Sequence, residues 1–289
     1  MADVASGGFA DNVTGGATER EGAAAGGVAG GVAGVVAYEV AGGSVRVEVA
    51  TPAGLAVITV DRPGARNAIS LETMDALDAA LDGAASASAL VIRGSGDRAF
   101  VSGGDLKDLA RIRDFDGAVA MALRMRRLCD RLATFPAPVI AALNGHALGG
   151  GAEVSVAADI RVAASDVTIA FNQSKLAIMP AWGGAERLAG LVGRPQALLL
   201  ATTGERIDAV EAHRIGLFDR VYPRESFESS WRALAASIAS SPSRALKKVI
   251  AAAAPHHHPS LEEEAAAEFA NLWISDAHWQ AADAITRKP

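Results

Sequence analysis

The chain has 289 residues, half of them hydrophobic, so it is long enough for one large domain with an appendage. Its net charge of -6 and pI near 5.6 exclude the basic surface that nucleic-acid binding requires. The single cysteine, Cys129, excludes an internal disulfide and lies among regularly spaced leucines, so we expect it to pack in the core. We therefore expect a cytoplasmic protein without a membrane segment.

The N-terminal region differs in composition from the rest of the chain. Residues 1–38 are dominated by glycine and alanine and show no apolar periodicity, so they cannot bury enough surface to offset their chain entropy. An uncharged run at 22–38 contains a GxxxG pair, but it is short for a membrane span and poor in leucine. We predict a disordered tail over 1–38, a core over 39–225 and a helical region over 226–289.

Strand and helix patterns follow one another from residue 45 onwards. Val45, Val47 and Val49 alternate with other residues before a second apolar run, which is typical of a β-hairpin. Ser70 is a suitable N-cap for the helix after it. Two units of strand, glycine loop and helix favour an α/β domain with a site built from loops. In chain order, the patterns predict strands at 45–49, 55–60, 89–93 and 139–143, and helices at 71–81, 117–134, 225–240, 243–254 and 260–279.

One glycine-rich stretch joins the predicted strand 139–143 to a helix. It runs from Asn144 to Glu153 and reads Asn-Gly-His-Ala-Leu-Gly-Gly-Gly-Ala-Glu. Three consecutive glycines let a ligand approach the main chain closely. The start of the helix offers N–H groups and the positive end of its dipole, and Glu153 lies in its first turn. The stretch therefore predicts an oxyanion site with an acid/base group beside it.

Four motifs occur in a fixed order along the chain. They are Arg62-Pro-Gly-Ala-Arg-Asn-Ala-Ile, Phe100-Val-Ser-Gly-Gly-Asp-Leu, the stretch from Asn144 to Glu153, and Ile178-Met-Pro-Ala-Trp-Gly-Gly-Ala-Glu-Arg-Leu. Together they resemble the signature of the enoyl-CoA hydratase/isomerase (crotonase) family, over about residues 44–289. The resemblance implies an α/β fold, a crotonase-like spiral of ββα turns with a C-terminal helical region. It also implies a homotrimer or homohexamer. The implied substrate is an acyl-CoA, so coenzyme A is part of the substrate and no separate cofactor is expected.

The resemblance also assigns roles at the reacting centre. It implies that the backbone N–H groups of Gly104 and Gly150 bind the thioester oxygen, and that Glu153 is the first catalytic glutamate. Chemistry next to a thioester carbonyl creates an enolate, and losing one donor to such a charge costs about 2.7 to 4 kcal/mol in the barrier. An apolar pocket would move the pKa of Glu153 toward working pH. The alternatives are a turn glycine, a close-packing glycine and a glutamate that only complements the helix dipole.

The chain departs from the family pattern at the second catalytic glutamate. Counting back from Pro180, that position falls on Gln173. An amide can orient a water or a carboxylate, but it cannot transfer a proton at neutral pH. Slow hydration, proton shuffling and loss of CO2 from a malonyl-type thioester therefore stay open. The spacing from Phe171 and the Pro-x-Trp-Gly-Gly segment also resemble ethylmalonyl-CoA decarboxylase-type members. A polar residue of the pocket wall is the alternative for Gln173.

Other residues of these motifs are expected to line the substrate site. Arg66 could meet a nucleotide phosphate or stay solvated, and Trp182 could contact substrate or only pack. His146 is expected to be packed or hydrogen-bonded, and the histidines at 256–258 lack the second ligand cluster that a metal site needs. The predicted substrate-binding set is Ala65, Arg66, Ser102, Gly103, Gly104, Asp105, Gly149, Gly150 and Trp182, with no metal.

The sequence therefore predicts an acyl-CoA lyase that stabilises a thioester enolate in an oxyanion hole. The alternatives are a decarboxylase of a malonyl-type acyl-CoA and a CoA-thioester binding protein whose catalytic pair has decayed at Gln173.

Overall fold

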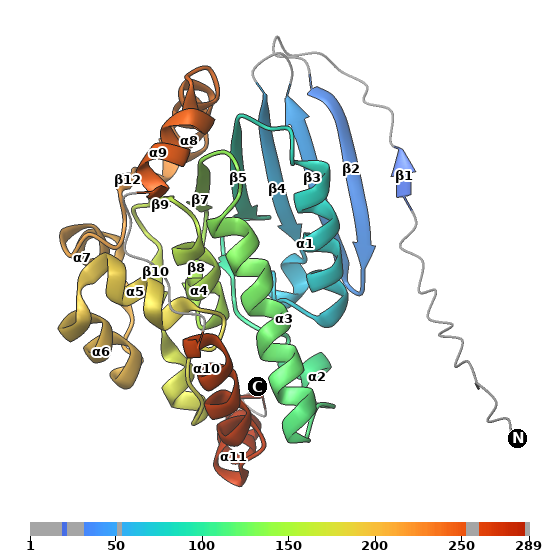
Figure 1. Cartoon of the computed structure of the whole chain (residues 1–289), viewed down its shortest axis with the longest axis vertical. Helices are drawn as coiled ribbons and strands as arrows, with labels where there is room; N and C mark the ends of the chain where they lie inside the picture. Colours follow the sequence, from blue (N-terminus) through green and yellow to red (C-terminus); the bar gives the residue numbers. More distant parts are fainter. Residues whose placement is uncertain (1–18, 22–31, 51–53, 253–259, 287–289) are drawn as a thin grey trace, which may run out of the picture.

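The computed structural model describes residues 19–21, 32–50, 54–252 and 260–286, which form two β-sheets surrounded by helices (Figure 1). The strands are β1 (Glu19–Glu21), β2 (Val32–Val40), β3 (Gly43–Ala50), β4 (Leu55–Asp61), β5 (Ala89–Gly94), β6 (Ala99–Val101), β7 (Val139–Leu143), β8 (His146–Leu148), β9 (Ile160–Ala164), β10 (Thr168–Ala170), β11 (Ile207–Asp208) and β12 (Arg220–Tyr222). The α-helices are α1 (Leu71–Gly83), α2 (Leu106–Leu109), α3 (Phe115–Ala133), α4 (Gly150–Ala157), α5 (Gly184–Val192), α6 (Arg194–Thr203), α7 (Ala209–Arg214), α8 (Phe227–Ala239), α9 (Ser243–Ala252), α10 (Ser260–Trp273) and α11 (Asp276–Thr286). Three 3-10 helices are η1 (Pro63–Ala65), η2 (Asn172–Leu176) and η3 (Arg224–Ser226).

The larger sheet has the strand order β1-β2-β3-β4-β5-β7-β9-β12 and contains most of the apolar strands. β3 and β4 form the predicted antiparallel hairpin, with Val47 opposite Ile58. From β4 onwards the neighbouring strands run parallel. Every residue of β7 is buried, as expected for a strand covered on both faces. α1 packs across β2, β3 and β4 and beside α3, and Ser70 caps α1 by accepting the Thr73 N–H.

The prediction of a disordered tail over 1–38 is wrong for residues 19–21 and 32–38. Residues 32–38 belong to β2, which pairs antiparallel with β3, and residues 19–21 form β1, which pairs antiparallel with β2. The Tyr38 hydroxyl also donates a hydrogen bond to the Ala79 carbonyl of α1. Such long-range partners can order a segment whose local composition is poor in apolar residues. Residues 1–18 and 22–31 of the predicted tail lie outside the described residues.

The smaller sheet, ordered β11-β10-β8-β6, brings three predicted site segments together. β6 runs parallel to β8, and β8 runs parallel to β10. The chain therefore leaves all three strands at the same edge, where the loop 102–105, the start of α4 and η2 follow. The sequence predicts no strand between Asn144 and the helix that contains Glu153, but β8 occupies 146–148. Three residues beside glycines are too few to show a strand period.

The C-terminal helices pack at both ends of the molecule. α8 packs on β4, β5 and β9, whereas α10 packs on α3 and α11 on η2 (Figure 1). The predicted single helix 260–279 is wrong, because α10 ends at Trp273 and α11 begins at Asp276. The Ser275 hydroxyl accepts the His278 N–H and so caps α11. Within the described part of the chain, each helix is too short or too polar to cross a bilayer.

Candidate active site

Glu153 lies in the first turn of α4, and its side chain is enclosed by the protein. It is 2% exposed, and its carboxylate accepts three hydrogen bonds. Oε2 accepts the backbone N–H groups of Trp182 at 2.7 Å and Gly184 at 3.0 Å, and Oε1 accepts Nε2 of Gln173 at 2.8 Å. Burial raises the pKa of Glu153 to about 7, while these three hydrogen bonds act in the opposite direction. The carboxyl can therefore accept and return a proton near neutral pH.

Gln173 lies in η2 and faces Glu153. Its side chain is buried, at 6% exposure, and its amide nitrogen is engaged by the Glu153 carboxylate. The amide oxygen, Oε1, is also buried, and within the described residues it has no hydrogen-bond partner. The structure thus places the residue counted back from Pro180 directly beside the glutamate. The pair consists of one carboxyl group and one amide with a free acceptor.

The two predicted oxyanion donors lie on adjoining loops. Gly104 follows β6, and Gly150 is the first residue of α4. A Cβ on Gly103 would lie 3.3 Å from the nitrogen of Gly150, so the loops are in contact. Among the hydrogen bonds of the described backbone, the N–H groups of Gly104 and Gly150 have no carbonyl partner, so both are available to a ligand oxygen. Gly149, which precedes Gly150, has a φ of 55°, a conformation that favours glycine.

The indole of Trp182 lies against both of these glycines. A Cβ on Gly150 would be 2.1 Å from Cζ3 of the ring, and one on Gly104 would be 3.8 Å from Cζ2. Trp182 is only 6% exposed. Only glycine therefore fits at position 150 beside this ring. The side chain packs at the centre of the site, and its backbone holds the glutamate.

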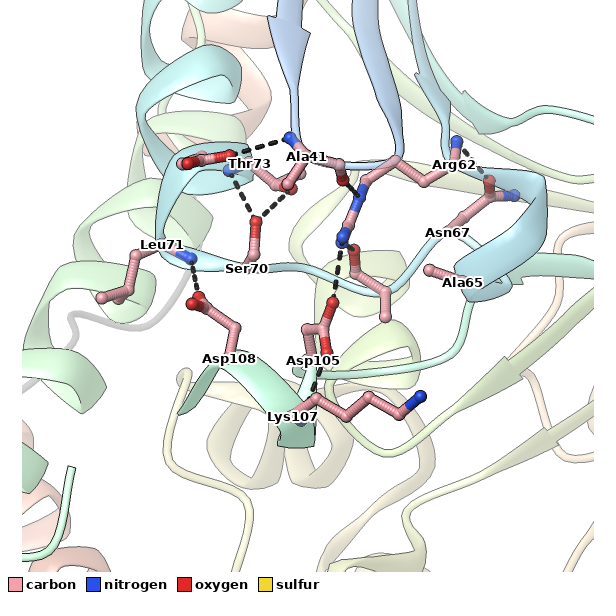
Figure 2. A network of polar contacts seen from close by, with 12 residues as sticks. Ala41, Arg62, Ala65, Asn67, Ser70, Leu71, Thr73, Asp105, Lys107 and Asp108 are labelled. Carbon is pink, nitrogen blue, oxygen red and sulfur yellow. Dashed lines mark hydrogen bonds and ion pairs between the residues drawn. The ribbon is translucent and has the colours of Figure 1, made fainter. Parts of the chain in front are cut away.

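A polar network fixes the Gly104 loop to the preceding part of the chain (Figure 2). Arg62, which is 4% exposed, donates from Nη2 to Oδ2 of Asp105 at 2.9 Å and from Nε to the Ala41 carbonyl at 2.8 Å. The other carboxylate oxygen of Asp105 accepts the Lys107 N–H and caps α2. Ile69 adds two backbone hydrogen bonds, one to the Gly103 carbonyl and one from the Asp105 N–H. Both oxygens of Asp105 thus have protein partners, so this side chain positions the loop, and its contact with substrate stays a prediction.

The remaining predicted residues lie around η1. The Ser102 hydroxyl is 3.5 Å from the Ala65 carbonyl, so the loop after β6 meets η1 there. Arg66 is exposed, and its backbone has a left-handed conformation with a φ of 53°. It follows η1 on the surface, and no contact joins it to Glu153 in the described structure.

Gly184 is a site residue that the sequence did not single out. Its N–H binds Glu153, and a Cβ there would lie 2.3 Å from Cγ of Glu153. The glycine pair after Pro180 signals a close approach to the main chain. It does not reveal which side chain makes that approach.

The other titratable candidates have structural partners. Nδ1 of His146 accepts the Thr168 N–H at 3.0 Å, which confirms the prediction of a hydrogen-bonded histidine. Cys129 is fully buried, as predicted, and burial raises the pKa of its thiol to about 12. Among the described residues, no group of His, Cys, Asp and Glu side chains has the arrangement of a metal site. The histidines at 256–258 lie outside the described residues.

Comparisons with known proteins identify the family of this chain. The sequence model of the enoyl-CoA hydratase/isomerase family matches residues 50–280. The chain belongs to the enoyl-CoA hydratase/isomerase family. It is 39% identical over 207 residues to a probable enoyl-CoA hydratase of Rhodobacter capsulatus, covering 71% of this chain and 79% of the relative. It is 33% identical over 196 residues to the short-chain-enoyl-CoA hydratase of Clostridium acetobutylicum, covering 67% and 75%.

Solved structures show that this member of the family has the expected fold. An enoyl-CoA hydratase from Mycobacterium avium subsp. paratuberculosis superposes with a TM-score of 0.74 at 27% identity, covering 84% of this chain and 98% of that one. The enoyl-CoA hydratase of Bacillus anthracis gives 0.69 at 31% identity, covering 84% and 96%. The predicted crotonase-like α/β fold with C-terminal helices is confirmed.

Proposed function

We propose that this enoyl-CoA hydratase/isomerase family member is an acyl-CoA lyase that hydrates enoyl thioesters through an enolate. The observation that carries the proposal is the buried Glu153 carboxyl, with a pKa of about 7, beside two loops whose Gly104 and Gly150 N–H groups are free. A thioester oxygen bound by both donors would become an oxyanion as the enolate forms. Each such donor lowers the barrier by about 2.7 to 4 kcal/mol.

One carboxyl group can serve both proton transfers of hydration. Ionised Glu153 takes a proton from water as the water oxygen bonds to Cβ of the enoyl group, and the π electrons move to the thioester oxygen. The neutral carboxyl then gives the proton to Cα, the enolate collapses to the thioester, and the net change is addition of one water. The free Oε1 of Gln173 supports this role, because it can accept a hydrogen bond from the water beside Glu153.

Decarboxylation is a second candidate, favoured by the amide at position 173. In a malonyl-type thioester, the bond from Cα to the carboxylate breaks, its electron pair forms the enolate and CO2 leaves. No base is needed for this step, and neutral Glu153 would then protonate Cα. One carboxyl group with a pKa of about 7 is sufficient.

Product analysis separates these reactions. The purified protein is incubated with crotonyl-CoA, ethylmalonyl-CoA and methylmalonyl-CoA separately, and products are identified by mass spectrometry. We expect addition of water to crotonyl-CoA and a loss of about 10²-fold or more in Glu153→Ala. Turnover unaffected by that substitution would refute the assignment of Glu153. Loss of CO2 from the malonyl-type substrates alone would establish the second candidate. Binding of crotonyl-CoA without turnover of any of the three would identify a non-catalytic thioester-binding protein.

Variants of Gln173 test its role beside Glu153. Gln173→Glu would restore a second carboxyl group, and we expect it to raise the hydration rate. Gln173→Leu keeps a similar volume but removes the hydrogen bonds, so it should lower kcat. A Gln173→Glu variant that folds and gains no hydratase activity would contradict our account of this departure from the family pattern.

We also propose that the protein assembles as a homotrimer or homohexamer. Several large apolar side chains on the outer helices are exposed, which is typical of protein interfaces. They include Leu198 and Leu199 on α6, and Leu246, Val249 and Ile250 on α9. Light scattering after size-exclusion chromatography tests the proposal, and a monomer at micromolar concentration would refute it.

A further inference from the structure

Trp182 combines two contacts that bear on which acyl groups the site accepts. Its backbone N–H binds Glu153, and its indole packs against Gly104 and Gly150. The ring therefore lies beside the carboxyl group and both proposed oxyanion donors. An acyl group bound there would have its carbonyl oxygen on the glycines and its Cα near the carboxyl, so the rest of its chain must pass this ring.

The position of Trp182 is fixed by further contacts of its backbone. Its carbonyl oxygen accepts a hydrogen bond from Nη1 of Arg187 at 3.1 Å, and Arg187 also pairs with Asp130. The backbone of Trp182 is thus held at its N–H by Glu153 and at its carbonyl by Arg187. A ring on so constrained a backbone can change rotamer, but it cannot move away as a unit.

The surroundings of the ring leave little free volume. Trp182 and Gln173 are each 6% exposed, and Glu153 is 2% exposed. The same Cβ on Gly104 that would lie 3.8 Å from the indole would lie 2.8 Å from Cδ1 of Leu109. Packed side chains thus enclose the position of the reacting carbons. Each methylene added to the acyl chain must displace one of these side chains.

We propose that Trp182 is a specificity-determining residue that restricts this site to short-chain acyl-CoA substrates. The inference rests on the proposed acyl-CoA lyase function. The backbone N–H that orients Glu153 remains in any variant of Trp182 other than proline. Side-chain substitutions therefore change the wall of the acyl site while leaving this donor to the carboxylate in place.

The test compares kcat/KM for crotonyl-CoA and trans-2-octenoyl-CoA in the wild type, Trp182→Phe and Trp182→Ala. We expect the wild type to prefer crotonyl-CoA by about 10²-fold, and Trp182→Ala to shift the ratio toward octenoyl-CoA by about tenfold or more, with a smaller shift in Trp182→Phe. Leu77→Ala, a buried substitution on α1, controls for general loss of packing and should leave the ratio unchanged. If Trp182→Ala does not fold, Trp182→Phe and Trp182→Leu decide by the same ratio.

Binding experiments test the chain-length preference independently of catalysis. Butyryl-CoA and octanoyl-CoA are titrated into the same variants by calorimetry, which requires no turnover. If the wild type turns over none of the substrates but binds butyryl-CoA much more tightly than octanoyl-CoA, and Trp182→Ala removes that difference, the lyase proposal fails and the inference about Trp182 stands. A folded Trp182→Ala variant with unchanged ratios, or a wild type that treats both chain lengths equally, would overturn the inference.

Discussion

Replacement of Glu153 by glutamine should change how the stability of the protein depends on pH. Burial raises the pKa of the carboxyl from 4.5 to about 7 in the folded state. The folded protein therefore holds this proton more tightly than the unfolded chain does. The contribution of Glu153 to stability is fully present below about pH 4.5, falls as the pH rises toward about 7, and then stays constant.

The size of the effect follows from the shift in pKa. At about 1.4 kcal/mol per pKa unit, ionising the buried carboxyl lowers the free energy of unfolding by about 3 kcal/mol. Glutamine cannot ionise, so Glu153→Gln should gain about 3 kcal/mol relative to the wild type between about pH 4.5 and about pH 8. The variant amide also fits the site. Its oxygen can accept the Trp182 and Gly184 N–H groups, and its NH2 can donate to the free Oε1 of Gln173 once that amide turns over.

The measurement is urea unfolding of both proteins across this pH range, at one fixed protein concentration. Any constant difference between the two side chains cancels, because only the change with pH is compared. Glu205→Gln, at an exposed position, serves as the control and should follow the wild-type curve. Parallel curves for the wild type and Glu153→Gln would refute the raised pKa and with it the proposed proton carrier.

The same geometry predicts effects on catalysis and on loop position. If the ionised carboxyl activates water, kcat/KM for crotonyl-CoA should rise with pH through about 7 and then level off; a flat profile would argue against general-base catalysis. Gly150→Ala places a methyl group 2.1 Å from the indole of Trp182, so we expect a loss of about 1–3 kcal/mol in urea unfolding and a fall in kcat of about 10²-fold or more. Its control, Gly190→Ala, meets nothing within 4 Å, and equal effects of the two variants would contradict the packing argument. Asp105→Asn leaves the buried Arg62 without its carboxylate and should cost about 3–5 kcal/mol in the same assay, together with a lower kcat; a neutral result would show that the pair does not hold the loop.

Local patterns predicted the elements whose stabilising contacts are close in sequence. Ser70 caps α1 as its position before an apolar helix indicated, and the alternating valines form the hairpin of β3 and β4. Elements that depend on distant partners were missed. β2 is ordered by its pairing with β3. The break before α11 is stabilised by the Ser275 cap, and it was missed because the apolar pattern of a helix continues across it.

The same distinction applies to the site. Counting residues back from Pro180 singled out Gln173, and the structure places this residue in hydrogen-bond contact with Glu153. Nothing in the order of residues revealed that the N–H groups of Trp182 and Gly184 converge on the Glu153 carboxylate. That convergence depends on how α5 packs against α4, which is a property of the tertiary structure.

The docking of α11 on η2 has a consequence for the order in which the site is assembled. Nδ1 of His278 donates a hydrogen bond at 2.7 Å to the carbonyl of Leu176, although the two residues are 102 positions apart. Leu176 ends the turn that carries Gln173. The turn gains this hydrogen bond only when α11 has packed on η2. Activity should therefore appear only after α11 has packed against the turn.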